Sequence, residues 1–209
     1  VIAVVPTGIA VHPSMPVKSL KQLAAFAKAT PGKLSYGSAG TGSITNLTGE
    51  LFKKAGGGLQ IVHVPYKGAG PGLADLVAGH IPMYTPTISA APLSYHKAGR
   101  IRMLAVCADK RLQAAPDIPT AIEGGMSDMV VYAFNAIYTT AGAPKAAVDR
   151  LHQATLKVLG DADFQAFLRK AGAEPVTDSS PEKTTRFLQS EIKRWTPISN
   201  EITQASAKK

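Results

Sequence analysis

The chain has 209 residues, of which 45% are hydrophobic and 18% are charged, a balance that is typical of globular proteins and excludes a disordered chain. The 23 Lys and Arg residues outnumber the 14 Asp and Glu residues, so the formal net charge is +9. The basic residues are scattered and form no stripe with aromatic residues, so we expect no nucleic-acid partner and regard the charge as suited to small acidic ligands.

The chain opens with an extended segment and a short helix. Residues 1–11 are mostly apolar and predict a strand, which Pro6 and Gly8 interrupt. Ser19 is a suitable N-cap for a helix that ends before the Pro-Gly pair at residues 31–32. No run of 18 apolar residues occurs, so the sequence predicts no transmembrane helix, and no signal peptide is recognised.

Residues 34–52 combine a short strand, a glycine-rich loop and an amphipathic helix. Backbone N–H groups at the start of a helix are free and the helix dipole favours negative charge there, so this order predicts an anion cradle. The alternative is a tight turn capped by Ser43, and the residues alone do not decide between the two. The candidate contacts are Ser38, Ala39, Gly40, Thr41, Gly42 and Ser43.

The loop does not carry a nucleotide-binding motif. A P-loop needs a lysine after its second glycine, and none follows here. The dinucleotide pattern G-x-G-x-x-G also fails, because Thr45 stands where the third glycine is required. We therefore expect no cofactor.

Two further turns at residues 65–72 and 85–89 follow predicted strands and precede predicted helices. In open parallel sheets ligands bind beyond the carboxyl ends of the strands, so we expect all three loops to line one rim. Tyrosines commonly pack beside glycine turns and lysines are commonly solvated, so Tyr66 and Lys67 also fit roles without a ligand. Thr87 and Ser89 fit helix capping as well as ligand contact. The candidate contacts in the two turns are Tyr66, Lys67, Gly68, Thr87 and Ser89.

The remaining segments predict the fold class. Residues 101–108 are a continuous apolar run of the kind found in buried parallel strands, and residues 129–140 are again extended. From residue 144 onward the periodicity is helical, and Pro197 is expected to kink the last helix. Strands that alternate with helices predict an α/β fold with a doubly wound sheet, on which the C-terminal helices pack as part of another lobe.

The sequence gives little support to an enzyme or a metal protein. The five histidines show neither an i, i+4 pair nor an H-E-x-x-H motif, so we expect no metal site. No acidic residue falls in the three loops and no G-x-S-x-G elbow occurs, so we expect no catalytic residues. Cys107 lies in an apolar strand and is interpreted as a buried small hydrophobe.

Several motifs in order resemble one family, the Bug (TctC-like) extracytoplasmic solute receptors of tripartite tricarboxylate transporters. The resemblance covers essentially the whole chain and is specific for the family rather than for a ligand. The motifs are PGKLSYGSAGTGSITNLTGELF, IVHVPYKGAGPGLADLVAGHI, KAGRIRMLAV, the PDIPT turn, and AGAEPV with SPEKTTRFLQSEIKRW.

This resemblance implies a periplasmic solute-binding protein of the type II fold, in which two doubly wound lobes surround a cleft. It implies a small carboxylate ligand held by backbone N–H groups, hydroxyls and water, and delivery to the membrane subunits of a transporter. The cradle at residues 38–43 and the turn Tyr66-Lys67-Gly68 match the family pattern. A ligand-sensing module for a signalling partner is the alternative, because both roles use the same closing lobes.

The resemblance also sets the expected domains. We expect the second lobe at residues 11–128, a remnant of the first lobe at residues 1–10 and 141–209, and a return crossing at residues 129–140. By the family pattern an N-terminal segment is missing, so the first lobe is expected to be incomplete and its exposed apolar surface to favour self-association. The loop at residues 85–89 lacks the acidic or amide residue of many members, which argues against amino-acid ligands.

Overall fold

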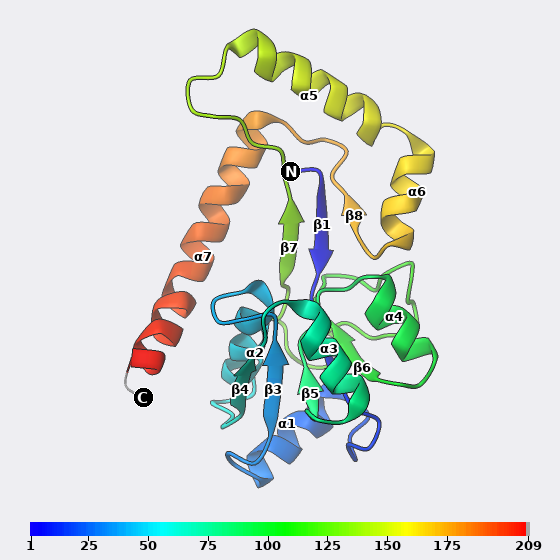
Figure 1. Cartoon of the computed structure of the whole chain (residues 1–209), viewed down its shortest axis with the longest axis vertical. Helices are drawn as coiled ribbons and strands as arrows, with labels where there is room; N and C mark the ends of the chain where they lie inside the picture. Colours follow the sequence, from blue (N-terminus) through cyan, green and yellow to red (C-terminus); the bar gives the residue numbers. More distant parts are fainter. Residues whose placement is uncertain (208–209) are drawn as a thin grey trace.

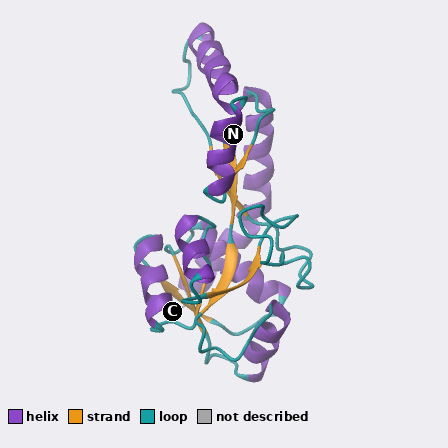
Figure 2. Ribbon diagram, turned by 90° about the vertical axis from the view of Figure 1, so that its right-hand side faces the viewer, coloured by secondary structure: helices purple, strands orange, loops and turns teal. Residues whose placement is uncertain are grey.

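The computed structural model describes residues 1–207, with side chains up to residue 202, as two unequal units joined by extended segments (Figures 1 and 2). No helix in this described part is both long and apolar enough to span a bilayer. The elements in chain order are β1 (Ala3–Pro6), β2 (Gly8–Val11), α1 (Leu20–Ala29), β3 (Ser35–Ser38), α2 (Ile44–Ala55), β4 (Val62–Pro65), α3 (Ala69–Ala78), β5 (Met83–Tyr84), α4 (Ala90–Lys97), β6 (Arg102–Val106), β7 (Tyr132–Asn135), α5 (Lys145–Leu159), α6 (Ala162–Lys170), β8 (Glu174–Pro175) and α7 (Pro181–Ala207).

The larger unit, here called the five-stranded unit, contains a sheet of order β4-β3-β5-β2-β6 with helices α1 to α4. Strand β3 is parallel to β4 and β5, whereas β2 is antiparallel to both of its neighbours. Gly8–Val11 pairs with β5 and β6 and is therefore part of this sheet. The periodicity of an apolar strand does not reveal its direction, so the sequence alone could not place β2.

The smaller unit, here called the three-stranded unit, contains a sheet of order β7-β1-β8. Helices α5 and α6 and the first turns of α7 accompany this sheet (Figure 1). Strand β1 pairs antiparallel with both neighbours. Few residues are fully buried here, since α5 buries only Leu159 and α6 buries none.

The hydrophobic core lies on both faces of the larger sheet. Successive residues of β2 point to opposite faces, so Ile9 belongs to one buried cluster and Ala10 to the other. One cluster includes residues of α1 and α2, and the other includes residues of α3 and α4. Cys107 is completely buried in the first cluster, which confirms the prediction of a small core residue, and burial raises the pKa of its thiol to about 12.

Two crossing segments, residues 6–8 and 130–132, connect the units. The N–H of Thr7 donates to the carbonyl of Val131 at 2.9 Å, and the N–H of Val131 donates to the carbonyl of Cys107 at 2.8 Å. The crossing is therefore a hydrogen-bonded pair of extended chains, and the units are linked at a narrow waist (Figure 2).

Candidate functional site

The three predicted loops do lie along one edge of the larger sheet. Strands β3, β4 and β5 are mutually parallel, and each is followed by its loop and then by α2, α3 or α4. The carboxyl ends of parallel strands share an edge, so three helix N-termini begin on the same rim. The N–H of Gly8 donates to the carbonyl of Pro86, and the N–H of Ile88 donates to the carbonyl of Pro6. These two bonds place the rim beside the crossing segments, where it faces the smaller unit (Figure 1).

The first loop is folded around its own side chains. The N–H of Ala39 donates to Thr45 Oγ1 at 2.9 Å, and the N–H of Gly42 donates to Asn46 Oδ1 at 2.9 Å. The glycines permit this path, since Gly40 and Gly42 have φ values of 133° and 77°. Four of the N–H groups in the loop, those of residues 39, 40, 42 and 43, are therefore already satisfied within the protein.

Three further N–H groups of this segment have no acceptor among the described residues. They belong to Thr41, Ile44 and Thr45, of which the last two form the first turn of α2. Ser43 is the N-cap, the role that the tight-turn interpretation gives it, and its hydroxyl accepts from the N–H of Asn46 at 3.2 Å. The loop thus presents a small set of free donors at the positive end of a helix dipole, which is the arrangement that an anion cradle needs.

Ser38 and His63 support the loop from beneath. Ser38 is fully buried and its hydroxyl lies 2.7 Å from Nε2 of His63 and 3.2 Å from the carbonyl of Gly40. The His63 ring stacks on Tyr36 with a centroid distance of 4.9 Å. The hydroxyl of Ser38 is therefore directed into the protein, while the exposed part of the loop is residues 41 and 42.

Asn46 organises the loop and was not a candidate in the sequence. It is completely buried, and besides holding Gly42 it donates from Nδ2 to the Tyr36 hydroxyl at 2.7 Å. That hydroxyl also lies 2.7 Å from Glu50 Oε1, and burial, followed by the Glu50 charge, raises the pKa of Tyr36. The available signal was an amide side chain three residues after an N-cap serine, in the first turn of the helix.

The second loop is hydrogen-bonded to the first. The N–H of Tyr66 donates to the carbonyl of Ser38 at 3.0 Å, and the N–H of Gly68 donates to the carbonyl of Ala39 at 3.1 Å. The Tyr66 hydroxyl donates to Asp75 Oδ2 at 2.8 Å, so this side chain is used within the protein. Lys67 is exposed on the same loop and brings a positive charge to the rim.

The third loop is tied to the helix of the first. The hydroxyl of Thr85 donates to the carbonyl of Thr45 at 2.7 Å. Thr87 forms an isolated antiparallel bridge with Thr7 of the crossing segment. Ser89 is exposed at the N-cap position of α4, where its side chain makes no capping hydrogen bond.

The carboxylate of Asp75, near the second loop, is bound by Tyr66 and His80 of the five-stranded unit. Asp75 is the carboxylate nearest to the loops in sequence, and hydrogen bonds from Tyr66 and then His80 hold its pKa below the usual value. Burial, followed by the hydrogen bond to Asp75, raises the pKa of Tyr66 to about 12. No group of three or more His, Cys, Asp or Glu residues suited to a metal ion occurs in the described part of the chain.

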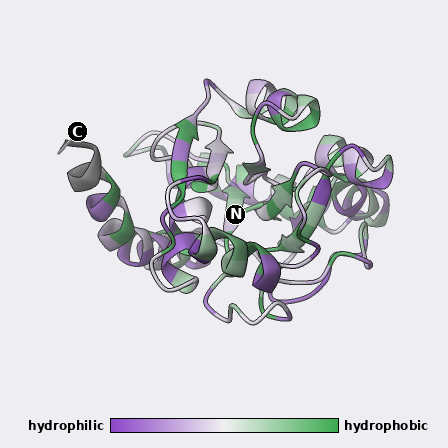
Figure 3. Ribbon diagram, turned by 90° about the horizontal axis from the view of Figure 1, so that it is seen from below, coloured by the Kyte–Doolittle hydropathy of each residue, from purple (hydrophilic) through white to green (hydrophobic). Residues whose placement is uncertain are grey.

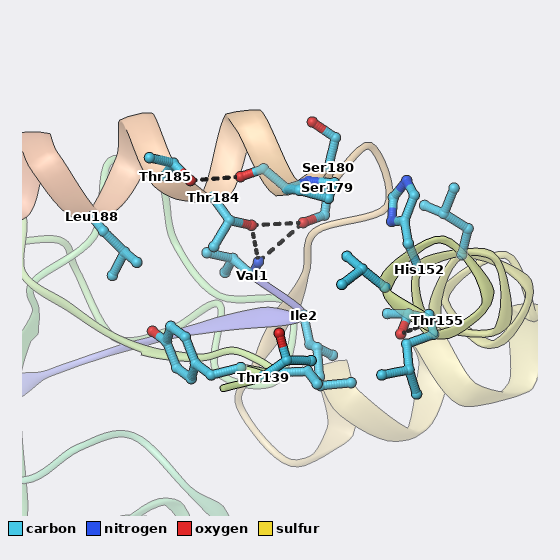
Figure 4. A pocket seen from close by; sticks show the side chains of 16 residues that line it. Val1, Ile2, Thr139, His152, Thr155, Ser179, Ser180, Thr184, Thr185 and Leu188 are labelled. Atoms are coloured by element: carbon cyan, nitrogen blue, oxygen red, sulfur yellow. Dashed lines mark hydrogen bonds between the residues drawn. The ribbon is translucent and has the colours of Figure 1, made fainter. Parts of the chain in front are cut away.

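A separate hollow of about 280 Å³ lies in the three-stranded unit, between α5 and α7 (Figure 4). Leu151, Leu156 and Leu188 line it together with hydroxyls such as that of Thr155. Its lining contains no Lys, Arg, Asp or Glu side chain, and it contains none of the three rim loops. The rim is therefore the better candidate for recognition of a charged ligand.

Comparison with known proteins identifies the family. The model of the tripartite tricarboxylate transporter family receptor, TctC, matches residues 1–204. A UPF0065 protein of Bordetella pertussis is 34% identical over 94% of this chain and 60% of its own length, and the protein BugT of the same organism is 30% identical over 94% and 60%. The chain therefore spans about 60% of the length of these curated relatives.

Solved structures agree with the fold. R. palustris Rpa4515 with adipate superposes with a TM-score of 0.87 at 33% identity, covering 97% of this chain and 67% of that one. MatC from Rhodopseudomonas palustris with bound malate gives a TM-score of 0.83 at 25% identity, with coverage of 94% and 67%. The α/β periplasmic binding protein fold is confirmed, and the family is one of receptors rather than enzymes. This chain belongs to the TctC family of tripartite tricarboxylate transporter receptors.

Proposed function

We propose that this chain is a periplasmic receptor that binds a small carboxylate, with a dicarboxylate as the preferred class, and delivers it to the membrane subunits of a tripartite transporter. The observation that carries the proposal is the set of free N–H groups at Thr41, Ile44 and Thr45, beside loop N–H groups that side chains already occupy. The relatives with adipate and malate support the class of ligand.

In this proposal one carboxylate of the ligand accepts hydrogen bonds from these three N–H groups. The exposed hydroxyl of Thr41 and the ammonium of Lys67 lie on the neighbouring surface and add polar contacts or attraction. Ser38 and Ser43 shape the loop, since their hydroxyls bond to Gly40. Thr87 and Ser89 border the site where it meets the crossing segments, and Tyr66 holds α3 through Asp75.

The position of the rim suits a receptor. It faces the crossing segments and the smaller unit, so a ligand on the cradle lies where the two units approach one another. Rotation about a narrow waist is a common way for binding proteins to close on a ligand. The carboxylate that does not touch the cradle would then meet the opposite unit.

A single substitution tests the cradle. Ile44 is the first residue of α2, and Ser43 before it has φ −69° and ψ 158°, the extended conformation that a residue before proline prefers. Ile44→Pro therefore removes one free N–H with little change of backbone. Ile44→Ala is the matched control, because it removes the same apolar side chain and keeps the N–H.

The measurement is thermal unfolding with and without adipate or malate. A ligand that binds only the folded state at about 100 times Kd stabilises it by roughly 2.7 kcal/mol. We expect the ligand to stabilise Ile44→Ala as it stabilises the unsubstituted chain. In Ile44→Pro we expect the affinity to fall about tenfold or more, because one hydrogen bond to a charged group is lost. Equal shifts in both variants would contradict the cradle, and flat curves with all carboxylates tested in the unsubstituted chain would contradict the ligand class.

A further inference from the structure

Helix α7 contacts both units. Near its start Phe187 packs edge-on against Phe134 of β7, with ring centroids 5.1 Å apart. Near its other end Glu201 Oε1 lies 3.5 Å from Lys54 Nζ of α2. Figure 1 shows the helix running from the smaller unit past the waist to the side of α2, which makes α7 a third connection between the units.

The middle of α7 is fastened at the waist. The guanidinium of Arg194 donates to the carbonyl of Val130, in the second crossing segment. Trp195 is half-buried and packs against the core cluster that contains Val131 and Phe52. Rotation of the units about the crossing segments would therefore move α7 against the five-stranded unit.

The attachment at Trp195 can be released at small polar cost. The indole N–H donates to Glu191 Oε2 at 2.8 Å, one turn earlier in the same helix. The Arg194 guanidinium lies over the indole ring, 4.7 Å from its centroid, and also belongs to α7. If α7 leaves the five-stranded unit, the indole keeps its contacts with Glu191 and Arg194, which are on the same helix. Water can replace Arg194 at the exposed carbonyl of Val130. The main loss is the apolar contact of Trp195 with the core cluster.

The contact beyond Trp195 is incompletely packed. Ile198 and Ile202 of α7 face Leu51 and Leu59 across a hollow of about 470 Å³. The ion pair at the edge of this hollow is well exposed, with 63% of each side chain accessible, so it adds little stability. Bands of hydrophobic and hydrophilic residues alternate along this part of α7 (Figure 3).

Pro197 lies between these two attachments. A proline inside a helix has no N–H, so the bond to the carbonyl of Lys193 cannot form, and helices bend most readily at such a position. The weakest point of the helix thus falls between the waist contact at residues 194–195 and the groove contact at residues 198–202.

We propose that residues 194–202 of α7 form a detachable strap, which restrains rotation of the two units about the crossing segments and bends at Pro197 when they move. The strap regulates opening of the rim that the proposed receptor function uses, and its consequence for ligand capture rests on that function. The existence of the strap as a mechanical restraint does not rest on that function, and it is tested without ligand.

Fluorescence gives a direct test, because Trp195 is the only tryptophan of the chain. Ile198→Asp combined with Ile202→Asp places charges in the groove and should release the strap. Ile192→Asp is the matched control, since Ile192 is on the same helix and 66% exposed. We expect quenching of Trp195 by acrylamide to rise about twofold or more in the double variant only, as for a locally opened segment.

Two further readouts separate a strap from a structural helix. In the double variant the urea midpoint of far-UV circular dichroism should stay near that of the control, while small-angle scattering should show a larger radius of gyration. Pro197→Ala should slow hydrogen exchange at residues 198–202 and leave residues 187–192 unchanged. The proposal would be overturned if Trp195 were quenched equally in the unsubstituted chain and in the double variant. A lowered urea midpoint or an unchanged radius of gyration in the double variant would overturn it as well.

Discussion

The two units differ in how completely they bury their apolar side chains. The five-stranded unit buries residues on both faces of its sheet and exposes only Val62 and Ile122 among its large hydrophobic residues. The three-stranded unit and α7 leave many more exposed, namely Ile137, Tyr138, Leu151, Val158, Phe167 and Ile192. The first unit has the burial of an independently stable domain, whereas the second depends on the contacts of α7 and on any surface that covers those side chains.

The difference also places the candidate site. The rim loops rest on the well-packed unit, where Tyr36, Asn46 and Ser38 are fully buried beneath them. A site with rigid support loses little conformational entropy when a ligand binds. In the proposed receptor the unit that moves relative to the rim is the less densely packed one, so the proposal places recognition and motion in different parts of the molecule.

The largest effect should come from a matched pair of phenylalanine substitutions. Phe52 of α2 is 0% exposed, and Phe167 of α6 is 65% exposed. We expect Phe52→Ala to lower the free energy of unfolding by about 3–5 kcal/mol, because it leaves a cavity in the core. Phe167→Ala should change it by about 0.5 kcal/mol or less. Urea unfolding measures both, and similar losses would remove the distinction between the units.

A glycine pair sharpens the account of how tightly the site is supported. A Cβ on Gly49 would lie 2.1 Å from the ring of Tyr36, whereas a Cβ on Gly70 would meet no atom within 4 Å. Gly49→Ala should cost about 1–3 kcal/mol and displace the Tyr36 ring from Asn46 and Glu50. Gly70→Ala in α3 should be neutral or stabilising by up to about 1 kcal/mol. A neutral Gly49→Ala would show that α2 can move away from β3.

The smallest effect concerns acid stability of the five-stranded unit. Hydrogen bonds from Arg111, then from the N–H of Thr120, lower the pKa of Glu123 to about 2. A lowered folded-state pKa means that this stabilisation is complete above the ordinary value near 4.5 and is lost as the pH falls toward 2. Glu123→Gln should therefore flatten the fall in stability between these pH values, as should Arg111→Gln. An unchanged slope in both variants would refute the interaction.

The sequence predicts much of this architecture because local signals were strong. The helix starts after Ser19 and Ser43 follow from capping residues, and both serines occupy N-cap positions in the structure. The strand–loop–helix order placed the three loops on one rim. These features depend on residues that are close in the sequence, where hydrogen bonds and periodicity carry the information.

Features that depend on tertiary contacts could not be predicted in the same way. The antiparallel direction of β2 is set by its neighbours β5 and β6, and the reach of α7 to α2 is set by packing across the waist. Within the loop, the sequence indicated hydroxyl donors but not that Asn46 and Thr45 would occupy the N–H groups of Gly42 and Ala39. Which N–H groups remain free is decided by these side chains.

The most direct test of the account is a titration of the isotopically labelled chain with adipate, followed through backbone amide resonances. We predict that the N–H signals of Thr41, Ile44 and Thr45 shift most, because these groups have no acceptor among the described residues. Those of Ala39, Gly40 and Gly42 should shift less, since Thr45, Ser38 and Asn46 already bind them. Binding that shifts resonances of the three-stranded unit and leaves the three free N–H groups unchanged would contradict the carboxylate cradle.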